Sequence, residues 1–138
     1  MRKRTRAREL ALQTIYQFEL RDNTFDDEAQ TFLQSQNQDP EINDFIQDLI
    51  RGYLAHQSEI DQAIKKIALN WDITRMAIID RIILRLGVYE LMFRPDVPPA
   101  VAINEAVDLA KKYGDKDSGA FVNGILDKIH HSQPERKE

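Results

Sequence analysis

Basic residues crowd the first eight positions of the chain, and no acidic residue occurs among them. Guanidinium groups donate hydrogen bonds to phosphate oxygens and stack on unpaired bases, and phosphates and bases are what a nucleic acid offers a protein. The pattern therefore indicates a surface for a polyanion. An ordinary solvated basic tail is the alternative that composition leaves open. The residues concerned are Arg2, Lys3, Arg4, Arg6 and Arg8.

The rest of the chain carries the opposite charge. The whole chain of 138 residues has a formal net charge of -4, which taken alone disfavours nucleic acid as a partner. No lysine or arginine occurs in residues 22–50, where acidic residues are frequent. This segregation marks the start of the chain as a local basic patch on an acidic body.

Residue types that perform catalysis or bind metals do not occur in a recognisable set. There is no cysteine, which excludes a disulfide framework and thiolate chemistry. His56 is isolated, and the adjacent His130 and His131 would point about 100° apart on a helix, so they do not readily share a metal ion. No glycine-rich loop follows a strand to hold a phosphate. We therefore expect no enzyme activity, no cofactor and no metal site.

Apolar residues recur at helical spacing through most of the chain, and strand signals are nearly absent, which predicts an all-α fold. The first helix is expected at about residues 5–20. A second row on this helix, Arg8, Leu12 and Tyr16, has a spacing of four and either forms a contact ridge for a partner or is covered by a neighbouring helix. The expected core face is Ala7, Leu10, Ala11, Thr14, Ile15 and Phe18.

Further helices are expected in the middle of the chain, at about residues 24–33, 40–53 and 74–93. Asp39 should cap the second of these, and Ser58 with Asp61 should form a capping box that opens another helix. Arg81 and Arg85 are expected as a basic pair on the flank of the helix at 74–93. Trp71, the only tryptophan, is expected to plug a junction between two subdomains.

The last part of the chain has the signals of a helix hairpin. Pro98 and Pro99 end the preceding element, because proline lacks the N–H that a continuing helix needs. Gly114 should end the first helix of the hairpin, and Ser118 should cap the second. The whole pattern predicts a single domain, 1–138, of about seven helices in two packed bundles, at about residues 5–70 and 71–131.

Three blocks of sequence resemble the NusB family, in the order and spacing of that family. AINEAVDLAKKYG at 102–114, followed by FVNGILDKI at 121–129, is similar to its C-terminal part. RARELALQ at 6–13, followed by IYQ at 15–17, is similar to its opening helix, and the pairs Asp80-Arg81 and Leu84-Arg85 with YEL at 89–91 are similar to its central helix. Residues 23–70 match only in helical pattern.

The resemblance implies a two-subdomain helical protein that is a non-catalytic transcription antitermination factor. It would bind the boxA segment of nascent RNA jointly with a small-subunit ribosomal protein, NusE, as part of the RNA polymerase antitermination complex at ribosomal RNA operons. A cytoplasmic location is expected. No segment has the apolar length that a bilayer requires, so a membrane partner is not expected.

The resemblance also implies the site residues. Tyr16, Asp80 and Arg85 would contact the ribosomal protein, although Asp80 and Arg85 could instead form ordinary ion pairs. Asp117 either accepts from a base amino or ribose hydroxyl group or caps the last helix, and Phe121 either stacks on a base or is buried. The RNA surface would comprise Arg4, Arg6, Arg8, Tyr16, Asp117 and Phe121.

One position departs from the family pattern, because Thr5 stands where many members have another basic residue. The missing basic residue bears on how strong the basic patch is and not on whether the patch exists. The alternative function is a protein-only helical adaptor or a homodimer without direct RNA binding, in which Leu12 and Tyr16 are buried between subunits. The sequence does not determine the oligomeric state or which RNA bases are read.

Overall fold

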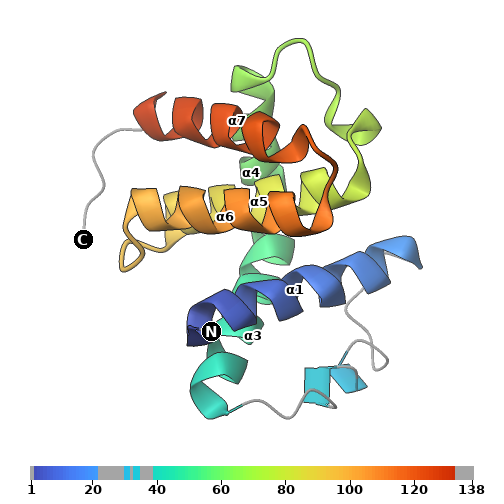
Figure 1. Ribbon diagram of the computed structural model, residues 1–138, viewed down its shortest axis with the longest axis vertical. Coiled ribbons are helices and arrows are strands. Elements are labelled where there is room, and N and C mark those ends of the chain that lie inside the picture. The colour runs from blue at the N-terminus through green and yellow to red at the C-terminus, as the bar shows by residue number, and fades with distance from the viewer. Residues whose placement is uncertain (1, 22–29, 32, 35–38, 133–138) are drawn as a thin grey trace. The chain divides into compact units, whose positions relative to one another are not determined.

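The computed structural model describes residues 2–21, 30–31, 33–34 and 39–132, and within them it contains helices and no strand. The all-α prediction is confirmed. The short helix expected at residues 24–33 lies largely outside the described part, but Gln30, Thr31 and Leu33 are helical. The elements, shown in Figure 1, are α1 (Lys3–Leu20), α3 (Pro40–Ala55), α4 (Gln57–Ile67), the 3-10 turn η1 (Ile73–Arg75), α5 (Ile78–Phe93), α6 (Pro99–Tyr113) and α7 (Ser118–Ser132).

Contacts within the chain divide it into two compact units, Met1–Gly52 and Tyr53–Glu138, here called the N-terminal and C-terminal units. The division falls inside α3, earlier in the chain than the boundary near residue 70 that the sequence suggested. The arrangement of the whole chain as one domain with bundles at 5–70 and 71–131 stays a prediction.

In the N-terminal unit, α1 buries the expected core face, since all six predicted residues, from Ala7 to Phe18, are buried. The start of α3 is capped as predicted, because the Ile42 N–H donates to Asp39 Oδ1 at 3.0 Å. The start of α1 is different: it has neither a side-chain cap nor an acidic residue in its first turn.

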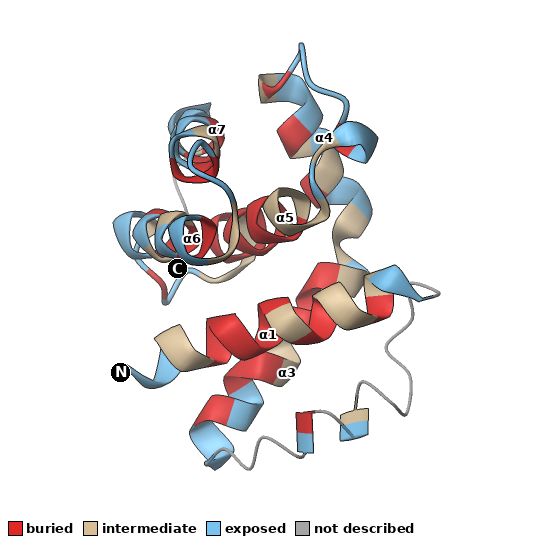
Figure 2. Cartoon of the chain, turned by 45° about the vertical axis from the view of Figure 1, so that its right-hand side comes forward, coloured by how far each residue is buried: buried red, intermediate tan, exposed pale blue. Residues whose placement is uncertain are grey.

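The C-terminal unit is built around α5, which contacts α4, α6 and α7. Every residue of α5 from Ile82 to Leu91 is buried (Figure 2). A helix that is apolar on all sides needs neighbours on all sides, so its composition explains its central position. The predicted hairpin is present: Pro99 opens α6, and α7 runs back antiparallel to it (Figure 1).

Two expectations about local structure were wrong. The capping box does not form, because α4 begins at Gln57, its N-cap residue His56 makes no side-chain capping bond, and Ser58 lies inside the helix. Trp71 plugs no junction, since it is 58% exposed at the surface of the C-terminal unit. Among the described residues, no helix is both long and apolar enough to cross a membrane.

Candidate nucleic-acid interface

The N-terminal end of α1 gathers cations around its first turns. Lys3 extends its Nζ to within 3.0 Å of Glu41 Oε2 and 3.4 Å of Asp39 Oδ2. The hydrogen bond to Glu41, with the charge of Asp39, raises the pKa of Lys3 above its ordinary value. Two acids of the same unit therefore already neutralise Lys3.

Arg4 and Arg8 lie one helical turn apart, and both guanidinium groups sit over the ring of Phe45. Their Cζ atoms are 4.5 Å and 5.2 Å from the ring centroid, which is the geometry of a cation–π contact. Arg4 is exposed, whereas Arg8 is only 4% exposed. Phe45 therefore fixes an exposed guanidinium at Arg4, while Arg8 belongs to the packing between α1 and α3.

In its exposure, Arg6 is intermediate between the exposed Arg4 and the buried Arg8. Its Nη1 lies 3.3 Å from Oε1 of the buried Glu9, and its side chain is partly exposed. Arg8 is not one of the residues expected in the core face of α1, but it is buried. The ridge of Arg8, Leu12 and Tyr16 is mostly covered within one chain, because Leu12 is 1% exposed and only Tyr16 is half-buried.

These cations occupy the end of α1 where the helix dipole is positive. Because the first turn holds no acid, the arrangement is unfavourable for the helix itself, by a few tenths of a kcal/mol for each charge. The same positive field favours an incoming anion. The N-terminal end of α1 is therefore suited to phosphate oxygens.

The second set of predicted RNA residues lies at the tip of the α6–α7 hairpin, in the C-terminal unit. Asp115 organises this tip, since its Oδ1 accepts from the Asp117 N–H at 2.9 Å, and Ser118 Oγ accepts from the Asp115 N–H at 3.0 Å. The Asp117 side chain is exposed. Phe121 is half-buried, with its ring centroid 5.1 Å from that of Trp71 in an edge-on arrangement, so it is neither fully buried nor fully open.

Arg85 lies inside the C-terminal unit instead of on an exposed flank. Its Nε and Nη2 donate to the two carboxylate oxygens of Asp61 at 2.8 Å and 3.0 Å, and its Nη1 donates to the Tyr53 hydroxyl at 3.0 Å. Burial lowers the pKa of Arg85, but the hydrogen bonds and charge interactions with Asp61 and Tyr53 together outweigh burial and hold this pKa above its ordinary value. The intramolecular ion pair is therefore the arrangement found, and contact of Arg85 with a partner stays a prediction.

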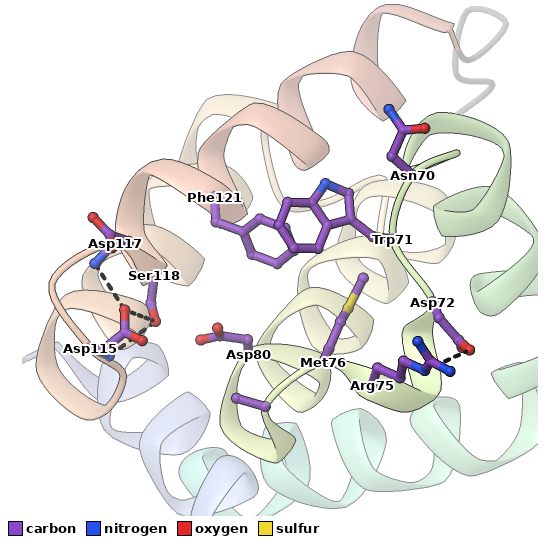
Figure 3. Close-up of a pocket in the computed structure, with 11 residues that line it drawn as sticks. Asn70, Trp71, Asp72, Arg75, Met76, Asp80, Asp115, Asp117, Ser118 and Phe121 are labelled. Atoms are coloured by element: carbon purple, nitrogen blue, oxygen red, sulfur yellow. Dashed lines mark hydrogen bonds and ion pairs between the residues drawn. The ribbon is translucent and has the colours of Figure 1, made fainter.

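Asp80, the other residue expected to contact a protein, lies at the start of α5. Its carboxylate is half-buried, and the Oδ1 atom is buried without a hydrogen-bond partner. Asp80 lines a pocket together with Trp71, Asp117 and Phe121, all within the C-terminal unit (Figure 3). The described residues contain no group of three histidine or acidic side chains placed to hold a metal ion.

The structure thus brings some predicted residues together within each unit. Arg4 and Arg8 meet over Phe45, and Asp80, Asp117 and Phe121 meet around one pocket. Sequence reasoning missed the aromatic partners of both groups, Phe45 and Trp71. Only Trp71 could have been noticed from the sequence. It is a single tryptophan between polar residues, in a segment that does not continue the helical spacing of apolar residues.

Comparison with known proteins identifies the family. The NusB family model matches residues 5–131. The transcription antitermination protein NusB of Anaeromyxobacter dehalogenans (strain 2CP-1) is 47% identical over 133 residues, which cover 96% of this chain and 93% of that protein.

Solved structures agree with this result. The structure of T. maritima NusB matches with a TM-score of 0.84 and 36% identity, over 94% of this chain and 91% of that one. A chain in the crystal structure of the antitermination factors NusB and NusE in complex with dsRNA matches with a TM-score of 0.86 and 32% identity, over 96% of this chain and 99% of that one. With a family model spanning most of its length and a relative nearly half identical, the chain belongs to the NusB family.

Proposed function

We propose that this protein is a non-enzymatic transcription antitermination factor that binds boxA RNA jointly with the ribosomal protein NusE at ribosomal RNA operons. Membership of the NusB family supports the proposal, and a similar solved chain is a NusB that was crystallised with NusE and dsRNA. A factor that works on RNA as it is transcribed would act in the cytoplasm.

The observation that carries the RNA part of the proposal is the exposed Arg4 guanidinium held over Phe45 at the positive end of α1. Because the ring already restricts the arginine, less conformational entropy is lost when a phosphate binds. Arg6 would add a second, weaker contact, since it shares its charge with Glu9. In this proposal Tyr16, Asp117 and Phe121 complete the RNA contacts, and Tyr16 and Asp80 face the ribosomal protein.

A partner protein is needed for physical reasons. The basic patch at the start of α1 is small, Lys3 and Arg6 already contact acidic side chains, and each phosphate contact weakens as salt rises, so this patch alone would bind RNA poorly at cellular salt. A second protein that holds the same RNA adds contacts and raises the local concentration of the strand. RNA affinity should therefore rise when NusE is added.

Replacing Arg4 by alanine is expected to weaken binding of boxA RNA by about tenfold in the presence of NusE, because one phosphate contact is lost. The slope of log affinity against log salt should fall by about 0.7 for the single-stranded RNA. The matched control is Arg51→Ala, which removes the same charge from an exposed position on α3 in the same unit and should change affinity by less than about twofold. Fluorescence anisotropy of a labelled RNA over a salt series measures both quantities.

Two results would contradict the proposal. One is an RNA affinity that does not increase when NusE is added. The other is an equal loss for Arg4→Ala and Arg51→Ala, which would mean that only net charge matters. Arg8→Ala is unsuitable for this test, because Arg8 is buried against Phe45 and its removal would disturb packing as well.

A further inference from the structure

The start of α3 places two carboxylates beside the cations at the start of α1. Lys3 Nζ lies 3.0 Å from Glu41 Oε2 and 3.4 Å from Asp39 Oδ2, and all three residues belong to the N-terminal unit. Lys3 and Arg4 are neighbours in the first turn of α1, so these acids contact the basic patch itself. A phosphate that approaches this end of α1 therefore meets a lysine that already has anions beside it.

Both carboxylates also stabilise the start of α3. Asp39 Oδ1 accepts from the Ile42 N–H at 3.0 Å, and this bond is the main cause that holds the pKa of Asp39 below its ordinary value. Glu41 lies in the first turn of α3, where the helix dipole favours an acid. Asp39 thus caps α3 with one oxygen and faces Lys3 with the other. Glu41 makes the shorter contact with Lys3, and its charge can be removed without removing the cap.

These ion pairs are weak enough for a ligand to open. The side chains of Lys3 and Glu41 are 55% and 70% exposed, so water and salt screen their attraction. For an RNA phosphate the pairs are nevertheless unfavourable, because the phosphate must displace two carboxylates from Lys3. Both carboxylates then remain close to the bound phosphate and repel it.

We propose that Lys3 is a latent phosphate-binding residue, and that Glu41 and Asp39 form an autoinhibitory contact that withholds it from RNA. Phosphate contacts carry no sequence information, so withholding one lowers the affinity for every RNA by the same factor. Unrelated RNA greatly outnumbers boxA in a cell, and it has only such contacts to offer. The inference rests on the proposed function, since it assigns a regulation to the same RNA surface.

Glu41→Gln tests this proposal in the full chain without NusE. The variant should bind boxA RNA about threefold more tightly, and the slope of log affinity against log salt should steepen by about 0.7, because Lys3 can reach one further phosphate. An RNA of the same length and scrambled sequence should gain by the same factor. Asp44→Asn is the matched control, since it removes the same charge from an exposed position of α3 and should change affinity by less than about 1.5-fold. Fluorescence anisotropy of the labelled RNAs measures these changes.

A double-mutant cycle separates release of Lys3 from general repulsion between Glu41 and RNA. Lys3→Met keeps an unbranched side chain without the charge, and alone it should weaken RNA binding by less than about twofold, because that charge is already neutralised. In the Lys3→Met background, Glu41→Gln should change affinity by less than about 1.5-fold, since the lysine that it would release is gone.

Three results would overturn the proposal. The first is an RNA affinity that Glu41→Gln leaves unchanged, and the second is an equal gain for Asp44→Asn. The third is a gain from Glu41→Gln that persists in the Lys3→Met background, because Glu41 would then repel RNA without involving Lys3. Failure of the proposed function gives different results, namely an RNA affinity that NusE does not increase, or an equal loss for Arg4→Ala and Arg51→Ala.

Discussion

Arg85→Ala is expected to lower the free energy of unfolding by about 3 kcal/mol, the largest effect of any single substitution considered for this protein. The substitution removes a buried guanidinium that makes two bonds to Asp61 and one to the Tyr53 hydroxyl. Asp61 would then remain as a largely buried carboxylate without its cation, and the Tyr53 hydroxyl would lose its donor. The cost arises mainly because these two buried polar groups lose their hydrogen-bond partner.

Urea denaturation followed by circular dichroism measures this loss. Arg75→Ala is the matched control, because its side chain is 88% exposed and its Nε is 3.9 Å from Asp72, so it should cost less than about 0.5 kcal/mol. Arg85→Lys should be intermediate, since an ammonium group keeps the charge but cannot bridge both carboxylate oxygens in the same plane. Equal stabilities for Arg85→Ala and Arg75→Ala would show that the buried pair contributes nothing.

This result also bears on how partner binding is tested. If Arg85→Ala unfolds part of the C-terminal unit, a loss of partner binding in that variant reports on stability and says nothing of a direct contact. Asp80→Asn is the better probe of the expected protein surface, because Asp80 lines the pocket and its replacement keeps the side-chain shape.

Most of the fold could be predicted from the sequence, because its signals are local. Periodic apolar residues set the buried face of α1, Asp39 marked the start of α3, and the prolines before α6 marked the start of the hairpin. The start of α4 was predicted wrongly, because it depends on a contact between residues that are distant in sequence. Ser58 and Asp61 have the spacing of a capping box, but Asp61 pairs instead with Arg85, which is distant in sequence.

The candidate site was less predictable, because burial of a charged residue depends on contacts between helices. Arg4 and Arg8 have the same residue type and lie on the same side of α1, yet one is exposed and the other is buried. The difference depends on α3, which supplies Phe45, and no pattern within α1 indicates it. Trp71 is a similar case, since its size suggested burial and its position in the fold leaves it open.

Gly114→Ala is expected to lower the free energy of unfolding by about 2 kcal/mol, because the hairpin tip has no room for a methyl group. A Cβ at this position would lie 2.6 Å from the Ser118 Cβ and 2.8 Å from the Ala110 carbonyl oxygen, and it would also meet Ser118 Oγ. Neither a backbone oxygen nor a Cβ moves aside easily. Since φ of Gly114 is -92, crowding and not backbone strain is the cause.

Gly124→Ala provides a control of opposite sign. This glycine lies inside α7, and an added Cβ would meet no atom within 4 Å. Alanine there should raise the free energy of unfolding by about 0.5–1 kcal/mol, because it restricts the unfolded chain and favours the helix. Urea denaturation of the two variants side by side compares the same chemical change in crowded and open surroundings. If Gly114→Ala were also stabilising, the turn at Asp115 and Ser118 would have to relax freely, and the pocket that this turn lines would lose its fixed shape.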